Sequence, residues 1–216
     1  MSEPDARTPR ERYRAQVREE AKTHAREQIA TAGASALSLN AIAKQMGMSG
    51  PALYRYFANR DELISELIRD AYRSLADTFR ARAGAGAGLG DLAHALRAWA
   101  LADPQRYLLV YGTPVPGYRA PEDTTRIAAE IMAVLLDACT ADAPPPGPPS
   151  PLETHLDGHR DWTAHHPAPP SALHRALTFW TRLHGVLSLE LAGHFTGMGF
   201  DPAVLYTAEA EAVAGP

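Results

Sequence analysis

The sequence predicts an all-α protein made of a small N-terminal domain and a larger C-terminal one. Apolar residues recur every three or four positions along most of the chain, which is the spacing of one helix face. No segment shows the strict alternation of a half-buried strand. Residues 38–57 read as two short helices joined by a glycine turn. We place the domain boundary after this segment, giving domains over 1–57 and 58–216.

The first predicted element is a long polar helix over residues 10–32. Its apolar side chains lie at steps of four, so they form one narrow stripe that another element can cover. The stripe consists of Val17, Ala21, Ala25 and Ile29.

The segment 38–57 has the signals of two helices meeting at a tight turn. Ser38 and Ser49 are predicted to cap them, because a serine hydroxyl can accept an amide proton of the first helical turn. Gly47 supplies the turn, where a residue without Cβ takes a positive φ. Pro51 lies in the first turn of the second helix, where its missing N–H costs little.

The second short helix is predicted to present most of its surface outward. Leu53 and Phe57, four residues apart, point inward. In a helix-turn-helix the second helix enters the major groove of DNA. The alternative is an ordinary helical hairpin with half-buried surface aromatics. The residues left facing outward are Gly50, Pro51, Ala52, Tyr54, Arg55 and Tyr56.

A connecting helix is expected to follow. Asn59 and Glu62 form a predicted capping box, with acidic residues at the positive end of the helix dipole. Apolar residues then recur at steps of four until the glycine-alanine run 83–90 breaks the helix. They are Leu63, Leu67, Ala71, Leu75 and Phe79.

The run IATAGASALSLNAIAKQMGMS followed by LYRYFANRDEL resembles the DNA-binding head of the TetR/AcrR family of transcriptional regulators. The resemblance implies an all-helical homodimer with two heads, bound to a palindromic operator. It also implies that a small ligand in the larger domain changes the spacing of the heads and releases DNA. The chain departs from the family pattern at Arg60, where a lysine is frequent, and at Ala41, where an acidic residue is frequent.

Charge is distributed as the resemblance requires. Residues 1–60 carry ten Lys/Arg and six Asp/Glu, whereas the whole chain has a net charge of −4. Positive potential on the head favours phosphate contact, while the acidic remainder disfavours binding through the other domain. We expect Tyr54 and Arg60 to hold phosphates and Arg55 to suit a guanine, with the capping serines Ser38 and Ser49 also at the DNA.

The C-terminal segment is expected to form the dimer. Apolar residues of 171–191 alternate steps of four and three, the spacing of a helix packed lengthwise on another. In the family, the last two helices pair with their mates as a four-helix bundle, which assigns that role to 171–213. Trp180, His184 and Gly185 resemble the Trp-His-Gly signature of one subgroup. The predicted interface residues are Leu187, Leu191 and Leu205.

A ligand pocket is predicted where aromatic residues fall on core-facing stripes of different helices in the second domain. Large apolar surfaces with a polar edge are typical linings for a small apolar or aromatic effector. Plain core packing is the alternative for each residue, and His184 could instead be a buried structural histidine. The predicted pocket residues are Phe79, Trp99, Tyr107, Tyr111, Trp180 and His184.

Residues 141–170 hold nine of the 18 prolines, so we expect a long, mobile surface loop without regular helix. His155 and His159 lie four apart there, but the prolines oppose a helix that would align them, and we expect no metal site. No cofactor is expected either. The alternatives to a regulator are a helical interaction module without DNA binding and an enzyme whose groups come from distant positions.

Composition favours a cytoplasmic protein. Apolar runs are too short to cross a membrane, and the charged N-terminus lacks the apolar region of a secretion signal. The single cysteine, Cys139, excludes an intrachain disulfide. We therefore predict a ligand-responsive transcriptional regulator, most simply a repressor, and not an enzyme.

Overall fold

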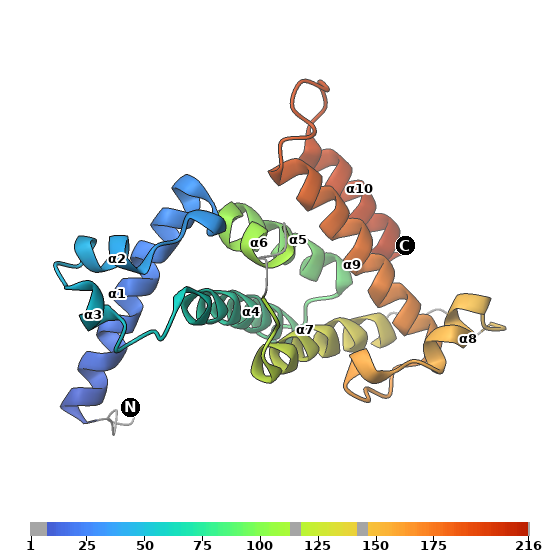
Figure 1. The fold of residues 1–216 in the computed structure, drawn as a ribbon. Coiled ribbons are helices and arrows are strands. Elements are labelled where there is room, and N and C mark those ends of the chain that lie inside the picture. The colour runs from blue at the N-terminus through green and yellow to red at the C-terminus, as the bar shows by residue number, and fades with distance from the viewer. Residues whose placement is uncertain (1–7, 113–117, 142–146, 216) are drawn as a thin grey trace. The chain divides into compact units, whose positions relative to one another are not determined.

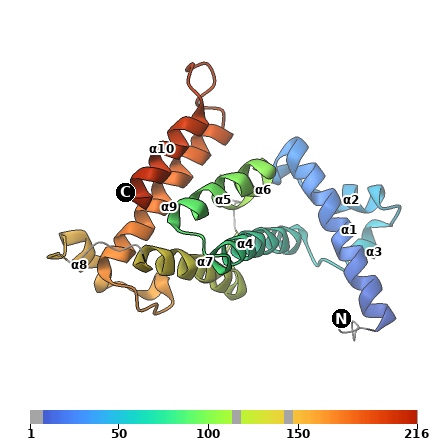
Figure 2. The same cartoon turned by 180° about the vertical axis from the view of Figure 1, so that it is seen from behind.

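The computed structural model describes residues 8–112, 118–141 and 147–215, and within these ranges it contains α-helices and 3₁₀-helices but no strand. The predicted all-α class is therefore confirmed. Two compact units form, and each is described by itself. The first comprises the chain up to Ile68 together with Tyr118 and Arg119, and the second comprises the other described residues from Arg69 on. Figures 1 and 2 show the helices from opposite sides.

The first unit is built from four helices and the start of a fifth. They are α1 (Pro9–Ala32), η1 (Ala34–Ala36), α2 (Leu39–Gln45), α3 (Gly50–Leu53) and the first residues of α4 (Arg60–Gly84). The predicted stripe of α1 is buried, from Val17 to Ile29. Thr8 caps α1 in a full capping box with Glu11, so the helix begins where its polar signals are placed.

The helix α4 is shared by the two units, because the boundary falls between Ile68 and Arg69 inside it. Asn59 caps it by accepting from the amide of Glu62 at 2.9 Å. The Glu62 carboxylate turns back to the amide of Ala58 at 2.6 Å rather than to Asn59, so the capping is reciprocal but shifted by one residue. All five residues of the predicted α4 stripe are buried.

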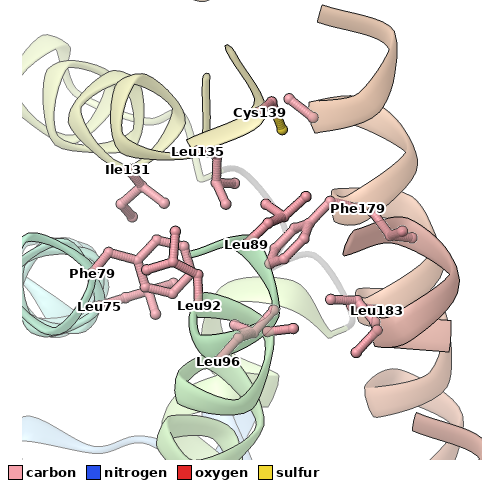
Figure 3. Packing of buried hydrophobic residues seen from close by; sticks show 14 of the residues in the cluster. Leu75, Phe79, Leu89, Leu92, Leu96, Ile131, Leu135, Cys139, Phe179 and Leu183 are labelled. Carbon is pink, nitrogen blue, oxygen red and sulfur yellow. The ribbon is translucent and has the colours of Figure 1, made fainter. Parts of the chain in front are cut away.

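The second unit packs the rest of α4 against six further helices. They are α5 (Leu89–Ala102), α6 (Pro104–Tyr111), α7 (Glu122–Ala141), α8 (Pro151–Asp157), α9 (Pro170–Leu191) and α10 (Pro202–Ala214). Figure 3 shows how leucine and phenylalanine side chains from four of these helices meet in one core. Phe79 of α4, Leu92 of α5, Ile131 of α7 and Phe179 of α9 contribute to it.

Cys139 lies at the edge of the same core and has no exposed surface. The helices α9 and α10 lie side by side in both views (Figures 1 and 2). Tyr206 fixes α10 to α5, because its buried hydroxyl donates to the carbonyl of Ala93 at 2.7 Å.

The proline-rich segment corrects one prediction. Residues 147–170 contain the helix α8 and the 3₁₀-helix η2 (Asp161–Thr163), where no regular helix was expected. Pro151 occupies the first turn of α8, where no N–H is needed, and Ser150 forms a capping box with Glu153. The prolines thus mark the start of a helix instead of preventing one. Residues 142–146 of the predicted loop lie outside the described residues.

Candidate nucleic-acid interface and ligand cavity

The turn between α2 and α3 follows the predicted design with one exception. The Ser38 hydroxyl accepts from the amide of Ala41 at 3.3 Å, and Gly47 has a φ of 67°. Ser49 precedes α3, but its hydroxyl makes no capping hydrogen bond, so that part of the prediction is wrong. Ser38 and Ser49 are both exposed.

The helix α3 presents its surface as expected. Leu53 and Phe57 are fully buried, whereas Pro51, Tyr54 and Arg55 are exposed. The α-helix itself is a single turn, and residues 54–56 continue it as a hydrogen-bonded turn. The remaining predicted contact residues, Gly50, Ala52, Tyr56 and Arg60, are partly buried.

Gly50 is fixed by a close neighbour. A Cβ built on it would come within 2.6 Å of Oδ1 of Asn40 on α2, so this position brings the two helices closer than a side chain permits without movement. The sequence shows a glycine at the start of α3 but not the asparagine opposite it. Gly50 therefore supports the packing of α2 on α3, and its predicted approach to DNA stays a prediction.

Arg18 of α1 holds the outward-facing turn in place. The Arg18 guanidinium donates to the carbonyl of Tyr56 and to the carboxylates of Glu66 and Glu62, the latter at 3.1 Å. Arg18 and these partners are called the Arg18 cluster. The same guanidinium lies 4.3 Å from the ring centroid of Phe57. Burial lowers the pKa of Arg18, but the hydrogen bonds that Arg18 donates to Glu66 and Glu62 outweigh this effect and raise the pKa above the ordinary value.

A second arginine of α1 supports the same turn, since Arg14 donates to the carbonyl of Arg55 at 3.2 Å. The backbone at Arg55 and Tyr56 is therefore held from behind while the Arg55 side chain stays exposed. Sequence reasoning missed Arg14 and Arg18. Their spacing of four on α1, one position after Tyr13 and Val17, is the available signal, because it places both on one edge of the apolar stripe.

Arg60 begins α4 and contacts the head's own backbone. Its guanidinium donates to the carbonyl of Ala34 at 2.5 Å and lies 3.5 Å from the Asp61 carboxylate. These contacts tie η1 to the start of α4. The predicted phosphate contact of Arg60 stays a prediction.

In the second unit, four of the six predicted pocket residues meet with one that was not predicted. The ring of His184 lies 4.2 Å from Trp180, 4.3 Å from Tyr111 and 5.6 Å from Tyr107, measured between centroids. Tyr72 of α4 packs edge-on against Tyr111 at 6.0 Å. These five residues, Tyr72, Tyr107, Tyr111, Trp180 and His184, are called the aromatic cluster.

Tyr107 is the hydrogen-bonded centre of this cluster. Its hydroxyl lies 3.0 Å from Nδ1 of His184 and 3.0 Å from the hydroxyl of Ser188, and it can donate to the His184 carbonyl at 3.2 Å. Burial lowers the pKa of His184 to about 3, so the imidazole is neutral at physiological pH. The imidazole of His184 thus bonds to the side chain of Tyr107.

Two polar atoms of the cluster have no partner among the described residues. The hydroxyl of Tyr111 and Nε2 of His184 are both buried without a hydrogen bond. Burial raises the pKa of Tyr111 well above its usual value, so its phenol stays protonated. A buried unpaired donor or acceptor costs about 1–3 kcal/mol, so such atoms are uncommon in folded proteins.

A cavity of about 770 Å³ borders the aromatic cluster. Tyr72, Tyr111 and Trp180 line one part of it, and η2 and α7 line the rest. Phe79 and Trp99 lie elsewhere: Phe79 is fully buried in the core (Figure 3), and the Trp99 indole donates to Ser74 at 3.1 Å. Among the predicted residues, only Tyr111 and Trp180 contact the cavity directly, while Tyr107 and His184 pack behind them.

Sequence reasoning missed most of the cavity wall. Ile131, Met132 and Trp162 provide apolar surface, and Trp162 lies within the proline-rich segment that was predicted to be a loop. Charged groups of both signs line the cavity, namely Arg126, Glu122 and Asp161. A tryptophan in a polar, proline-rich segment is the signal that could have pointed to Trp162.

The predicted dimer residues divide between core and surface. Leu187 has no exposed surface and belongs to the core of its own chain, whereas Leu191 and Leu205 are partly buried. The inner face of α9 is covered within the chain, since α5, α7, α8 and α10 all pack on this helix. The exposed outer face instead includes Gly185, Leu189 and Val204.

Metal and membrane features can be judged over the same ranges. His155 lies in α8 and His159 follows the end of that helix, and their rings stack with centroids 4.2 Å apart. Within residues 8–112, 118–141 and 147–215, no group of three potential metal ligands forms. No helix among these residues is both long and apolar enough to cross a lipid bilayer.

A capped two-helix turn with an outward-facing basic residue, followed by a helical unit with its own cavity, defines a helix-turn-helix transcriptional regulator. Residues 23–67 match the model of the bacterial regulatory proteins of the tetR family, and residues 89–213 match that of the tetracyclin repressor-like C-terminal domain. The chain belongs to the TetR family. The resemblance of Trp180, His184 and Gly185 to the Trp-His-Gly subgroup stays a prediction.

Relatives and solved structures agree with this family. The chain is 35% identical to the HTH-type transcriptional regulator Rv1816 of Mycobacterium tuberculosis over 199 residues, which is 85% of each chain. The crystal structure of the protein SCO4313 shares 71% identity and a TM-score of 0.89, covering 97% of this chain and 100% of that one. A protein of unknown function from Rhodococcus sp. RHA1, 21% identical with a TM-score of 0.66 over 98% and 97% of the two chains, shares the fold.

Proposed function

We propose that this regulator is a repressor that leaves a palindromic operator when a small apolar or aromatic effector binds its second unit. One observation supports this proposal most directly. The chain combines an exposed turn after α3, which Arg18 holds through the Tyr56 carbonyl, with a separate cavity bordered by aromatic rings. The cavity volume of about 770 Å³ falls within the range of small-molecule sites. A protein whose only role was to pair with another protein has no need for both.

The proposed DNA contacts divide by chemistry. Tyr54 and Arg60 hold phosphates, with the exposed hydroxyls of Ser38 and Ser49 beside them. Arg55 is the base-reading residue, because a guanidinium can donate two parallel hydrogen bonds to guanine. Around it, the small or flat residues Gly50, Pro51, Ala52 and Tyr56 allow close approach to the groove.

The test uses the full-length protein and duplexes from the region upstream of its own gene. Arg55→Ala is expected to relax the preference at one base pair and to cost about 1–3 kcal/mol there. Tyr54→Phe is expected to weaken binding to all duplexes alike. Arg82→Ala, an exposed basic residue near the far end of α4, is the control and leaves binding unchanged.

Fluorescence anisotropy over a set of single-base operator variants measures both effects, and affinity should fall steeply as salt rises. If Arg55→Ala changes neither the affinity nor the sequence preference, the proposed base-reading surface is wrong. A protein that binds no duplex at all supports the alternative of a helical interaction module.

We further propose that two copies pair through the outer face of α9 and α10. Thr181, Gly185 and Leu189 form an exposed stripe at steps of four on α9, and Val204 is 67% exposed on α10. Among the described residues, no atom outside the local backbone of α9 lies within 4 Å of a Cβ built on Gly185, so another backbone can approach it. Two-fold pairing places two heads on one palindrome.

Val204→Asp is expected to shift the protein toward monomer in sedimentation, because it places an unpaired charge on the paired face. Thr154→Asp on the exposed side of α8 is the matched control. Leu187→Asp is unsuitable, since Leu187 is buried in its own chain and its loss would unfold the unit. We place the protein in the cytoplasm, where its DNA is found, and assign it no catalytic role.

A further inference from the structure

The aromatic cluster leaves two buried polar atoms unpaired beside a cavity. The hydroxyl of Tyr111 and Nε2 of His184 have no hydrogen-bond partner among the described residues. Their rings lie 4.3 Å apart, and both rings contact Trp180. Tyr111 and Trp180 line the cavity, so the unpaired atoms lie one side chain away from the space a ligand can enter.

The chemistry of these two atoms limits what they can recognise. A tyrosine hydroxyl both donates and accepts, and Nε2 of a neutral imidazole does one or the other according to its tautomer. Tyr107 satisfies Nδ1 in either tautomer, because its hydroxyl can donate to it or accept from it. An uncharged hydroxyl or carbonyl can pair with this combination, whereas an anion would find no cation within the cluster to offset its desolvation.

The surroundings specify the remainder of the ligand. Trp162, Trp180 and Met132 provide flat or flexible apolar surface at the cavity. Aromatic rings pack well against such surfaces in stacked or edge-on geometry. The charged side chains at the cavity have both signs and do not select one ligand charge.

We propose that Tyr111 and His184 form a polar subsite for a neutral hydroxyl or carbonyl group carried by an aromatic effector. This proposal rests on the proposed ligand response. Since the Tyr111 hydroxyl has no accessible surface, the whole Tyr111 side chain must shift for the ligand group to pair with it. That ring packs against Tyr72 of α4, the helix that begins in the first unit, so ligand binding alters a contact of that helix.

The first experiment needs no ligand and compares two tyrosines of the same cluster. Tyr111→Phe removes an unpaired buried hydroxyl and is expected to raise Tm by about 2–4 °C. Tyr107→Phe removes a hydroxyl with three hydrogen-bond contacts and is expected to lower it. A fall in Tm for Tyr111→Phe as large as that for Tyr107→Phe would mean that the Tyr111 hydroxyl is already paired, which overturns the proposal.

The second experiment compares three probes of similar size, namely 2-naphthol, 2-methylnaphthalene and 2-naphthoate, by quenching of tryptophan fluorescence. The wild-type chain is expected to bind 2-naphthol about tenfold tighter than either other probe, the factor that one restored hydrogen bond supplies. In Tyr111→Phe and in His184→Phe this preference should fall below about threefold while 2-methylnaphthalene binds as before. Ala128→Phe, which fills the cavity from α7, should weaken all three probes.

The outcomes separate the subsite from the proposed function. Equal affinity of 2-naphthol and 2-methylnaphthalene, tighter binding of 2-naphthoate, or no binding of 2-naphthol each overturns the subsite. A preference for 2-naphthol that depends on Tyr111 supports the subsite even when operator DNA stays bound. In that last case the repressor proposal fails and the subsite stands.

Discussion

The Arg18 cluster of the head and the aromatic cluster of the second unit differ in whether their buried polar groups have hydrogen-bond partners. In the head, the Arg18 guanidinium is matched by a carbonyl and two carboxylates, and the side chains of Tyr54 and Arg55 are exposed to water. Nε of Arg60 is the exception there, since it is buried without a partner among the described residues. In the aromatic cluster, the unpaired atoms of Tyr111 and His184 are buried.

The roles proposed for the two regions account for this difference. A surface that reads DNA exchanges water for phosphates and bases, so its polar groups can stay hydrated at no cost until then. A buried site has no water to lose, and each unpaired atom there lowers stability until a ligand pairs with it. The comparison therefore predicts that the polar contacts of the Arg18 cluster stabilise the head. It also predicts that the unpaired polar atoms of the aromatic cluster destabilise the second unit.

The largest expected effect is on the acid stability of the second unit. The folded His184 takes up a proton only near pH 3, whereas the unfolded imidazole does so below about pH 6.5. Between these values the unfolded state binds more protons, so the free energy of unfolding falls as pH falls, by about 1.4 kcal/mol per unit at most. Urea unfolding at pH 7.5, 6.0 and 5.0 measures this slope.

His184→Gln should flatten the slope, and His94→Gln, an exposed histidine on α5, should leave it unchanged. An identical slope in both variants would show that the acid response comes from elsewhere in the chain.

The next effect concerns the head. Arg18→Met leaves Glu62, Glu66 and the Tyr56 carbonyl without their shared donor, and we expect a loss of about 2 kcal/mol in the free energy of unfolding, because the group is only 20% exposed. Arg12→Met, exposed on the same helix, is the control. Chemical denaturation followed by circular dichroism measures both, and equal stability of the two variants would contradict the comparison.

A smaller effect tests a paired tyrosine of the second unit. Tyr206→Phe removes the hydrogen bond from α10 to the Ala93 carbonyl and is expected to destabilise the chain by about 1 kcal/mol. This sign is the reverse of the one expected for Tyr111→Phe, although both hydroxyls are buried. Tyr13→Phe, at a position 61% exposed, should leave the thermal midpoint unchanged. Stabilisation by Tyr206→Phe would remove the distinction between paired and unpaired hydroxyls.

The smallest effect is expected at Gly50. In Gly50→Ala the new methyl group displaces the Asn40 side chain, which is exposed and can move, so stability should change by less than about 0.5 kcal/mol. Combining it with Asn40→Ala removes the clash and leaves the higher helix propensity of alanine. A double-mutant cycle by thermal unfolding should show the pair to be more stable than Gly50→Ala alone. If the effects of the two substitutions on stability simply add, the side chain at position 50 does not contact Asn40.

The head could be predicted from sequence because its signals are local. Caps, the glycine turn and the inward pair Leu53 and Phe57 all lie within twenty residues, and the structure places each of them as expected apart from the Ser49 hydroxyl. The Arg18 cluster joins residues about forty positions apart, and no pattern within one helix shows which carboxylates an arginine will meet.

The second unit was predictable only in part, because periodicity identifies the inner face of a helix but not what covers it. Leu187 and Phe79 face inward as expected, yet one is covered by its own chain and the other fills the core away from the cavity. A cavity is a place where packing is incomplete, and its position depends on the sum of all side-chain volumes. For α8, in contrast, the sequence contains the capping box of Ser150 and Glu153, which favours a helix. The many prolines led to the opposite prediction.

The reactivity of Cys139 toward a thiol reagent can report how often the core of the second unit opens. The thiol is the only one in the sequence, and it has no exposed surface in the core formed by α7 and α9. A thiol reagent can react with it only in molecules whose core has transiently separated, so at high reagent concentration the labelling rate reports the opening rate. Any ligand that favours the closed core must slow that reaction, whether or not it leaves a spectroscopic signal.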